Sequence, residues 1–273
     1  MAHADTQTRD HDRFAEANGL NLYYQEHGEG EPLLLLHGGL GTSSDWDAVV
    51  PYLAKHFRVI TPDSRGHGRT DNPTETLSYQ VMADDVVALS AALGLEKPAV
   101  CGWSDGGQIA LDIGVHHPDA ARALIAGGVR FQFTDDYVQR ASQLSFRQAD
   151  GRVDAERVAA AYPWTAALPD AHGYVYGIDH WKTLLQWSAD MWLTPFDLSP
   201  ENLQRISVPS LLVVGDHDKG FPVEESLGIF RQIADAELAV FPASDHSLPD
   251  AHPEAFASTV IAFLSRHGKA RFG

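Results

Sequence analysis

Short apolar runs alternate along this chain with longer segments in which apolar residues recur every three or four positions. The runs indicate strands buried on both faces of a sheet, because apolar residues occupy successive positions rather than alternate ones. They cover residues 32–36, 57–61, 98–102, 123–126, 211–214 and 237–241. Helical spacing predicts helices from the capping residues 42–45 to residue 53, and over 78–93, 105–116, 223–233 and 253–266. This alternation predicts an α/β fold, with a mostly parallel sheet and helices on both of its faces.

The start of the chain departs from this alternation. Residues 13–26 predict a β-hairpin, because two strand-like segments flank the turn pair Asn18-Gly19. The residues before it, 1–12, are polar and charged, and we expect them to form an N-terminal tail.

The alternation also stops between residues 131 and 200, where helical patterns rich in aromatic residues replace it. We expect a helical cap, or lid, over 131–200, inserted into a core built from 13–130 and 201–273. A lid over a pocket needs apolar surface that is available to a ligand. Trp164, Trp181 and Trp187 are therefore candidate substrate contacts.

Charge and composition narrow the class of partner. The chain has 37 Asp and Glu against 20 Lys and Arg, a formal net charge of −17, which argues against nucleic acid or an anionic membrane surface. No run approaches the ~18 apolar residues of a membrane span, and the first residues do not resemble a signal peptide. The lone Cys101 excludes an internal disulfide framework and predicts a small buried side chain. We expect a cytoplasmic protein that acts on a small molecule, in an oligomeric state that the sequence does not indicate.

One strand leads directly into a motif that carries chemistry. Residues 99–103 are followed by Ser104 inside a Gly-x-Ser-x-Gly sequence, and helical spacing begins at Asp105. A sharp strand-to-helix turn of this kind exposes the serine as a nucleophile. The flanking residues at Gly102 and Gly106 then pass too close to other backbone to carry side chains.

A serine nucleophile needs a base, and the base needs an orienting acid. Two later strands end at the same edge of a parallel sheet as Ser104. One is followed by Asp216-His217-Asp218, and the other by a loop that holds His246. The order Ser, Asp, His is the one expected for a strand–turn–helix nucleophile.

With these residues in place, the chain resembles the α/β-hydrolase fold family with a helical cap, from about Leu20 onward. The resemblance implies that Asp218, which closes a Gly-x-x-Asp turn, is the acid, and that His246 is the base. Asp216 is expected to stabilise the turn instead. Residues 62–70 also resemble a family signature, which we interpret as a structural turn held by Asp63 and Arg65.

An oxyanion needs backbone N–H donors that are already in place. The N–H of Asp105, directly after the nucleophile, is one expected donor. The sequence His-Gly-Gly at residues 37–39 resembles the oxyanion loop of the family and places Gly39 as the second donor, with Leu40 as the alternative. Leu40 and Trp103 are also expected to contact the substrate.

Asp105 has two interpretations. An acid in the first turn of a helix is favoured by the helix dipole. The segment Gly-Trp-Ser-Asp-Gly-Gly is also similar to that of the valacyclovir hydrolases, which implies that Asp105 holds a substrate amino group.

The sequence therefore predicts a serine hydrolase that cleaves an ester, thioester, lactone or activated amide of a small molecule through an acyl-enzyme. Carbon–carbon bond hydrolases and cofactor-free haloperoxidases use the same triad, so both stay open. A ligand receptor of the same fold with little turnover is the alternative of a different class. No cofactor is expected, and no metal site. His116-His117 lie at the end of a predicted helix, which favours such side chains by itself, and the spacing of residues 216–218 matches no standard set of ligands.

Overall fold

The computed structural model of the chain describes residues 11–196 and 198–267. Its centre is an eight-stranded sheet in the order β1-β2-β4-β3-β5-β6-β7-β8. The strands are β1 Asp12–Ala17, β2 Leu20–His27, β3 Pro32–Leu36, β4 Arg58–Pro62, β5 Ala99–Trp103, β6 Ala123–Gly127, β7 Ser210–Gly215 and β8 Ala236–Phe241. Strands β1 and β2 pair antiparallel, as do β2 and β4, and all other neighbours are parallel. The predicted mostly parallel sheet is confirmed.

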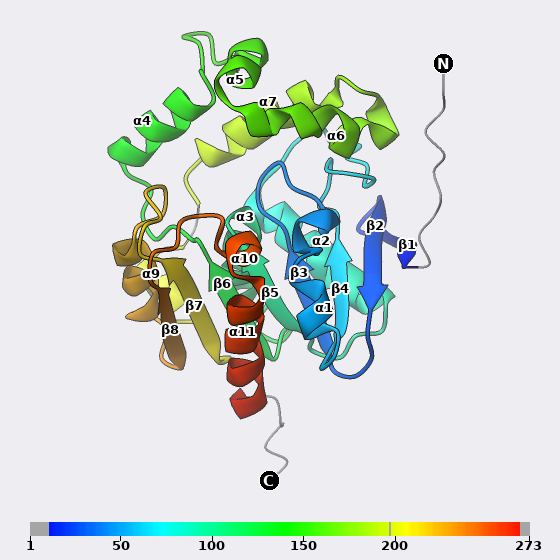
Figure 1. Cartoon of the computed structure of the whole chain (residues 1–273), viewed down its shortest axis with the longest axis vertical. Helices are drawn as coiled ribbons and strands as arrows, with labels where there is room; N and C mark the ends of the chain where they lie inside the picture. Colours follow the sequence, from blue (N-terminus) through cyan, green and yellow to red (C-terminus); the bar gives the residue numbers. More distant parts are fainter. Residues whose placement is uncertain (1–10, 197, 268–273) are drawn as a thin grey trace.

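Helices cover both faces of this sheet (Figure 1). One face carries η1 Ser43–Trp46, α1 Val50–Leu53, α10 Leu248–Ala251 and α11 Pro253–His267; the other carries α2 Tyr79–Ala92, α3 Asp105–His116, α8 Pro200–Leu203 and α9 Val223–Phe230. Because successive side chains of a strand point to opposite faces, the apolar run of β3 serves both layers. Leu33 and Leu35 pack towards α1 and α11, whereas Leu34 and Leu36 pack towards α2 and α3. No helix of the described residues is both long and apolar enough to span a bilayer.

The chain between β6 and β7 forms a layer of helices above the carboxyl ends of the parallel strands (Figure 1). It contains α4 Asp135–Leu144, α5 Ala155–Ala161, η2 Pro163–Ala167, α6 Leu168–Tyr176 and α7 His180–Trp192. We call these helices the cap. A small apolar cluster joins the cap to the loop after β3. It includes Trp181, Leu184 and Leu185 of α7 together with Leu40 of that loop.

Some predicted boundaries differ from the structure. The helix expected up to residue 53 is interrupted: η1 ends at Trp46 and α1 begins at Val50. Pro51 lies in the first turn of α1, where a backbone N–H has no acceptor within the helix, so the N–H that proline lacks is not needed there. Asp12 was expected in the tail, but it pairs with Gln25 as the first residue of β1. The rest of the tail, residues 1–10, lies outside the described residues. Asn18 and Gly19 both have positive φ, at 49° and 74°, as the predicted hairpin turn requires.

Buried charges organise the turn after β4. Asp63 accepts hydrogen bonds from the backbone N–H groups of Ser43 at 2.7 Å and Arg69 at 2.9 Å. Arg65 forms a bidentate pair with the buried carboxylate of Asp85 on α2. These contacts support the structural interpretation of residues 62–70.

Buried histidines attach the cap to this turn and to the loop after β3. His172 accepts the N–H of Gly68 at Nδ1 and donates from Nε2 to the carbonyl oxygen of Leu40, both at 2.9 Å. His180 lies 2.9 Å from the carbonyl oxygen of Gly66 through its Nε2. Because one ring nitrogen of His172 accepts and the other donates, the neutral imidazole fits this position and the cation does not.

Acid should therefore loosen the attachment of the cap. Burial lowers the pKa of His172 to about 4, from an ordinary value of 6.5. As pH falls, the unfolded chain takes up this proton before the folded chain does. The contribution of neutral His172 to the free energy of unfolding, on the order of 3 kcal/mol, is therefore complete above pH 6.5 and is lost by about pH 4. Between these values His172→Gln should reduce the pH dependence of the unfolding free energy by up to about 1.4 kcal/mol per pH unit. Denaturant titrations across this range measure it, with the exposed His56→Gln as control; an unchanged slope in H172Q would contradict the assignment.

Candidate active site

The turn between β5 and α3 holds Ser104 in a conformation that few residues adopt. Its φ of 57° and ψ of −119° lie outside the usual regions for a residue with a side chain. Its N–H donates to the carbonyl oxygen of Gly127 at 2.8 Å, which ties the turn to β6. A Cβ at Gly102 would lie 2.0 Å from the carbonyl oxygen of Gly106, and one at Gly106 would lie 2.1 Å from that of Leu36. The close approach of the backbone therefore explains why the motif has glycine at both positions.

Asp218 and His246, from the loops after β7 and β8, meet in a short hydrogen bond. His246 Nδ1 lies 2.6 Å from Asp218 Oδ2. The other oxygen of Asp218 accepts the N–H groups of Gly220 at 3.0 Å and Phe221 at 2.9 Å. Asp218 is buried, so three donors hold its carboxylate in one orientation. Asp216 instead accepts the N–H of Ser244 at 3.4 Å, within the turn.

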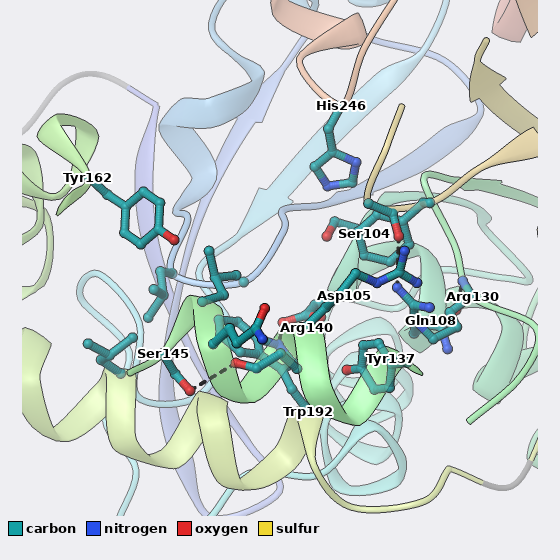
Figure 2. Close-up of a pocket in the computed structure, with 18 of the residues that line it drawn as sticks. Ser104, Asp105, Gln108, Arg130, Tyr137, Arg140, Ser145, Tyr162, Trp192 and His246 are labelled. Carbon is teal, nitrogen blue, oxygen red and sulfur yellow. Dashed lines mark hydrogen bonds between the residues drawn. The ribbon is translucent and has the colours of Figure 1, made fainter. Parts of the chain in front are cut away.

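The imidazole of His246 contacts two aromatic rings. It stacks on Phe221, with ring centroids 4.6 Å apart and 13° between the planes, and the tilted ring of Trp103 lies with its centroid 5.7 Å away. Trp103 Nε1 also donates to the backbone oxygen of His246 at 2.9 Å. Ser104 and His246 line the same cavity, as Figure 2 shows. No hydrogen bond between them is present in the described structure, and unliganded sites often close such contacts only around substrate.

Two candidate N–H donors lie beside Ser104. The N–H of Asp105 is the first of α3, and the first N–H groups of a helix have no acceptor within it. The loop after β3 approaches from the other side: a Cβ at Gly38 would lie 3.2 Å from Cβ of Ser104, and one at Gly39 would lie 2.4 Å from the Asp105 carboxylate. Leu40 has a φ of 59°, so the loop turns sharply there.

The carboxylate of Asp105 joins the core to the cap. Oδ1 accepts the hydroxyl of Tyr79 on α2 at 2.8 Å, and Oδ2 accepts Nε1 of Trp192 at the end of α7 at 2.9 Å. Burial raises the pKa of Asp105, and the two hydrogen bonds oppose that shift. Both oxygens therefore already have protein donors.

A cavity of about 590 Å³ lies between core and cap, with Ser104 and His246 in its wall. Of the residues predicted to bind substrate, Leu40, Asp105 and Trp164 line it. Trp103 instead lines a smaller pocket behind Ser104 and supports His246. Trp181 and Trp187 do not line this cavity: Trp181 is buried in the apolar cluster that includes Leu184 and Leu185, and Trp187 packs against that cluster and against His180.

Sequence reasoning missed most of the wall of this cavity. The lining residues that it did not single out include Tyr79, Gln108, Arg130, Tyr137, Arg140, Ser145, Tyr162, Trp192, Phe196 and Phe221. Two of them carried a readable signal. Gln108 lies one turn after Ser104 on α3, and Arg130 follows the carboxyl end of β6, the edge where Ser104 and His246 also lie. Within the described ranges, no group of three or more His, Cys, Asp or Glu side chains is placed to hold a metal ion.

Comparison with known proteins finds one matching family and several similar proteins. Residues 31–253 match the model of the family described as alpha/beta hydrolase fold. A 2-hydroxy-6-oxo-6-(2'-aminophenyl)hexa-2,4-dienoic acid hydrolase of Metapseudomonas resinovorans is 29% identical, over 93% of this chain and 91% of the relative. A 3-oxoadipate enol-lactonase of Acinetobacter baylyi is 27% identical, over 92% and 95%. The structure of a thermophilic esterase from Thermogutta terrifontis superposes with a TM-score of 0.75 at 24% identity, covering 94% and 99% of the two chains.

The backbone contact at Gly106 generates a stability prediction. Gly106→Ala should lower the free energy of unfolding by about 1–3 kcal/mol or more, because its Cβ meets backbone that no rotamer change can move. Gly173→Ala on α6 is the matched control, since the nearest atoms to its Cβ lie at 3.4 Å, an ordinary contact. Denaturant titration compares the two. Equal stabilities for G106A and G173A would show that the turn accommodates a Cβ at residue 106, which would contradict the prediction.

Proposed function

Because the chain belongs to the α/β-hydrolase fold family, we propose that it is a serine hydrolase that cleaves an ester, thioester, lactone or activated amide of a small molecule. The observation that carries this proposal is the 2.6 Å hydrogen bond between His246 and the buried Asp218, in the wall of the cavity that Ser104 also lines. A cavity closed by the cap suits a small substrate, and the proposal places the enzyme in the cytoplasm.

The proposed reaction has two halves. Ser104 Oγ attacks the substrate carbonyl while His246 Nε2 takes its proton and then delivers it to the leaving group. Asp218 keeps the proton of the imidazole on Nδ1, so that Nε2 is free to accept. The N–H groups of Gly39 and Asp105 stabilise the negative oxygen of the tetrahedral intermediate. A water molecule, deprotonated by His246, then releases the acid and regenerates Ser104.

A second candidate reaction has support from one comparison. The relative named as a dienoic acid hydrolase favours hydrolysis of a carbon–carbon bond, by the same three residues. The enol-lactonase and the esterase favour cleavage of a carbon–oxygen bond. Parallel assays of an aryl ester, a lactone and a dienoate with the same enzyme preparation rank these candidates.

The triad generates a prediction with an internal control. A nitrophenyl ester should release a burst of nitrophenol equal to the enzyme concentration, and Ser104→Ala should abolish it. Asp218→Asn should lower kcat by about 10³- to 10⁴-fold, because it favours the wrong tautomer of His246. Asp216→Asn, two residues away, should stay within about threefold of the wild type, because Asp216 accepts only a turn N–H.

The opposite outcomes have distinct meanings. Stoichiometric binding of ester without release would favour the receptor alternative. Equal losses in D218N and D216N would remove Asp218 from the triad.

The proposal gives Asp105 a positioning role, in place of the amine-binding role that the valacyclovir hydrolases suggest. Both of its oxygens accept protein donors, Tyr79 and Trp192, and burial disfavours its charge. Asp105→Asn retains one acceptor but turns an amide N–H₂ against the other donor.

An aminoacyl ester and its des-amino analogue test these two roles of Asp105. We expect the wild-type kcat/KM values for this pair to agree within about threefold, and D105N to lower both by a similar factor of about ten or more. Rates measured over a range of substrate concentrations give both constants. A preference for the aminoacyl ester that D105N removes would establish amine binding instead.

A further inference from the structure

Two buried residues that line one side of the cavity carry hydrogen-bond donors that nothing in the described structure accepts. Gln108 is buried and lines the cavity. Its Oε1 accepts the backbone N–H of Arg130 at 3.0 Å, which fixes the amide, and its Nε2 has no partner. A buried donor without an acceptor costs about 1–3 kcal/mol, so an unused amide beside a nucleophile indicates a group that arrives with the substrate.

Arg130 supplies further unused donors next to this amide. It is 4% exposed, and its guanidinium lies between the rings of Tyr137 and Phe221, at 3.8 and 4.8 Å from their centroids. Nη2 donates to the carbonyl oxygen of Gly220 at 2.9 Å, whereas Nε and Nη1 have no hydrogen-bond partner. Figure 2 shows Gln108 and Arg130 together, on the side of the cavity where Ser104 lies.

The charge of Arg130 is only partly balanced by the protein. Glu225 Oε1 lies 3.8 Å from Nη1, beyond hydrogen-bond distance, and its Oε2 already accepts the N–H groups of Phe131 and Gln132. Arg140, which also lines the cavity, is paired with Asp136 at 2.9 Å. Asp105 would repel an anion, but its oxygens are occupied by Tyr79 and Trp192. The unsatisfied cationic group in this wall is therefore the guanidinium of Arg130.

We propose that Arg130 and Gln108 form a carboxylate subsite, so that this hydrolase prefers substrates whose acyl group ends in a second, anionic carboxyl. The inference rests on the proposed function and names the substrate class of the same site. A carboxylate offers two oxygens with several acceptor positions, which suits Nε and Nη1 of a guanidinium and one amide N–H. These three nitrogens have almost no exposed surface in the described structure, so the bound carboxylate must displace the side chains that cover them. The overall charge of −17 repels anions at long range, so this selectivity comes from short-range contacts.

The position of Gln108 sets the length of the preferred acyl group. Gln108 is four residues after Ser104 on α3, a rise of about 6 Å along the helix axis. A chain with about two to four carbons between the scissile carbonyl and the distal carboxylate spans that interval. Succinyl, glutaryl and adipyl half esters are the acyl groups that fit.

Three nitrophenyl esters of equal length test the subsite: the glutarate half ester, its methyl-capped neutral form, and an apolar alkanoate. For the wild-type enzyme we expect kcat/KM for the anionic ester to exceed that for both neutral esters by at least about tenfold, mainly through KM. Equal values, or a higher value for the methyl-capped ester, would overturn the carboxylate subsite.

Variants assign the preference to its residues. Arg130→Met should reduce the ratio of anionic to neutral kcat/KM by about tenfold or more. Gln108→Glu, which keeps the acceptor for the Arg130 N–H and replaces the free donor with a negative charge, should reduce it as well. Arg140→Met is the matched control and should keep the ratio. If R140M lowers the ratio as much as R130M does, the anionic preference arises from the overall electrostatic potential of the cavity, and the subsite is wrong.

A binding measurement separates this inference from the proposed function. Ser104→Ala should be stabilised against heat by millimolar glutarate monoamide, and the double variant with R130M should not. This readout needs no turnover, so it tests the subsite even if no ester is cleaved. Hydrolysis of the neutral esters without any anionic preference, and without stabilisation by the monoamide, would contradict the subsite and leave the hydrolase function in place.

Discussion

The site depends on backbone segments that lie closer together than side chains would allow. β5 can turn into α3 above the end of β3 only because Gly102 and Gly106 present no Cβ where carbonyl oxygens lie about 2 Å from the Cβ position. That contact forces Ser104 into its unusual φ and ψ, and raises its hydroxyl into the cavity instead of the helix layer. It also brings the first N–H of α3 beside the loop after β3. The proposed nucleophile and the proposed oxyanion donors thus depend on one packing constraint.

Around this turn, one edge of the parallel sheet brings together candidate functional side chains from distant parts of the chain. Asp218 follows β7, His246 follows β8 and Arg130 follows β6, so the carboxyl ends of neighbouring strands supply them all. The cap closes the edge through polar contacts in addition to apolar packing. Trp192 donates to Asp105 beside Ser104, and His172 contacts Leu40 in the loop after β3. Displacement of the cap would therefore disturb the proposed catalytic geometry as well as the cavity wall.

The periodic core was readable from the sequence, because strands buried on both faces and amphipathic helices have distinct patterns. The pairing of Asp218 with His246 was also readable, since strand order and the family turn restrict where each residue lies. The wall of the cavity was not. Trp181 and Trp187 on α7 have the same composition signal as Trp164 on η2, and only the packing of the cap decides which of them lines the cavity. The positions of Arg130 and Gln108 could be read from the sequence, but their unpaired donors are visible only in the structure.

We propose that the hydroxyl of Ser104 is an activated nucleophile. Fluorophosphonate labelling followed by peptide mass spectrometry tests it directly, because such reagents modify a serine only when a base and an oxyanion site act on it. The account predicts one adduct per chain, located on Ser104, which forms much more slowly in D218N and at the wild-type rate in D216N. An unmodified Ser104, or an adduct on another residue, would contradict it.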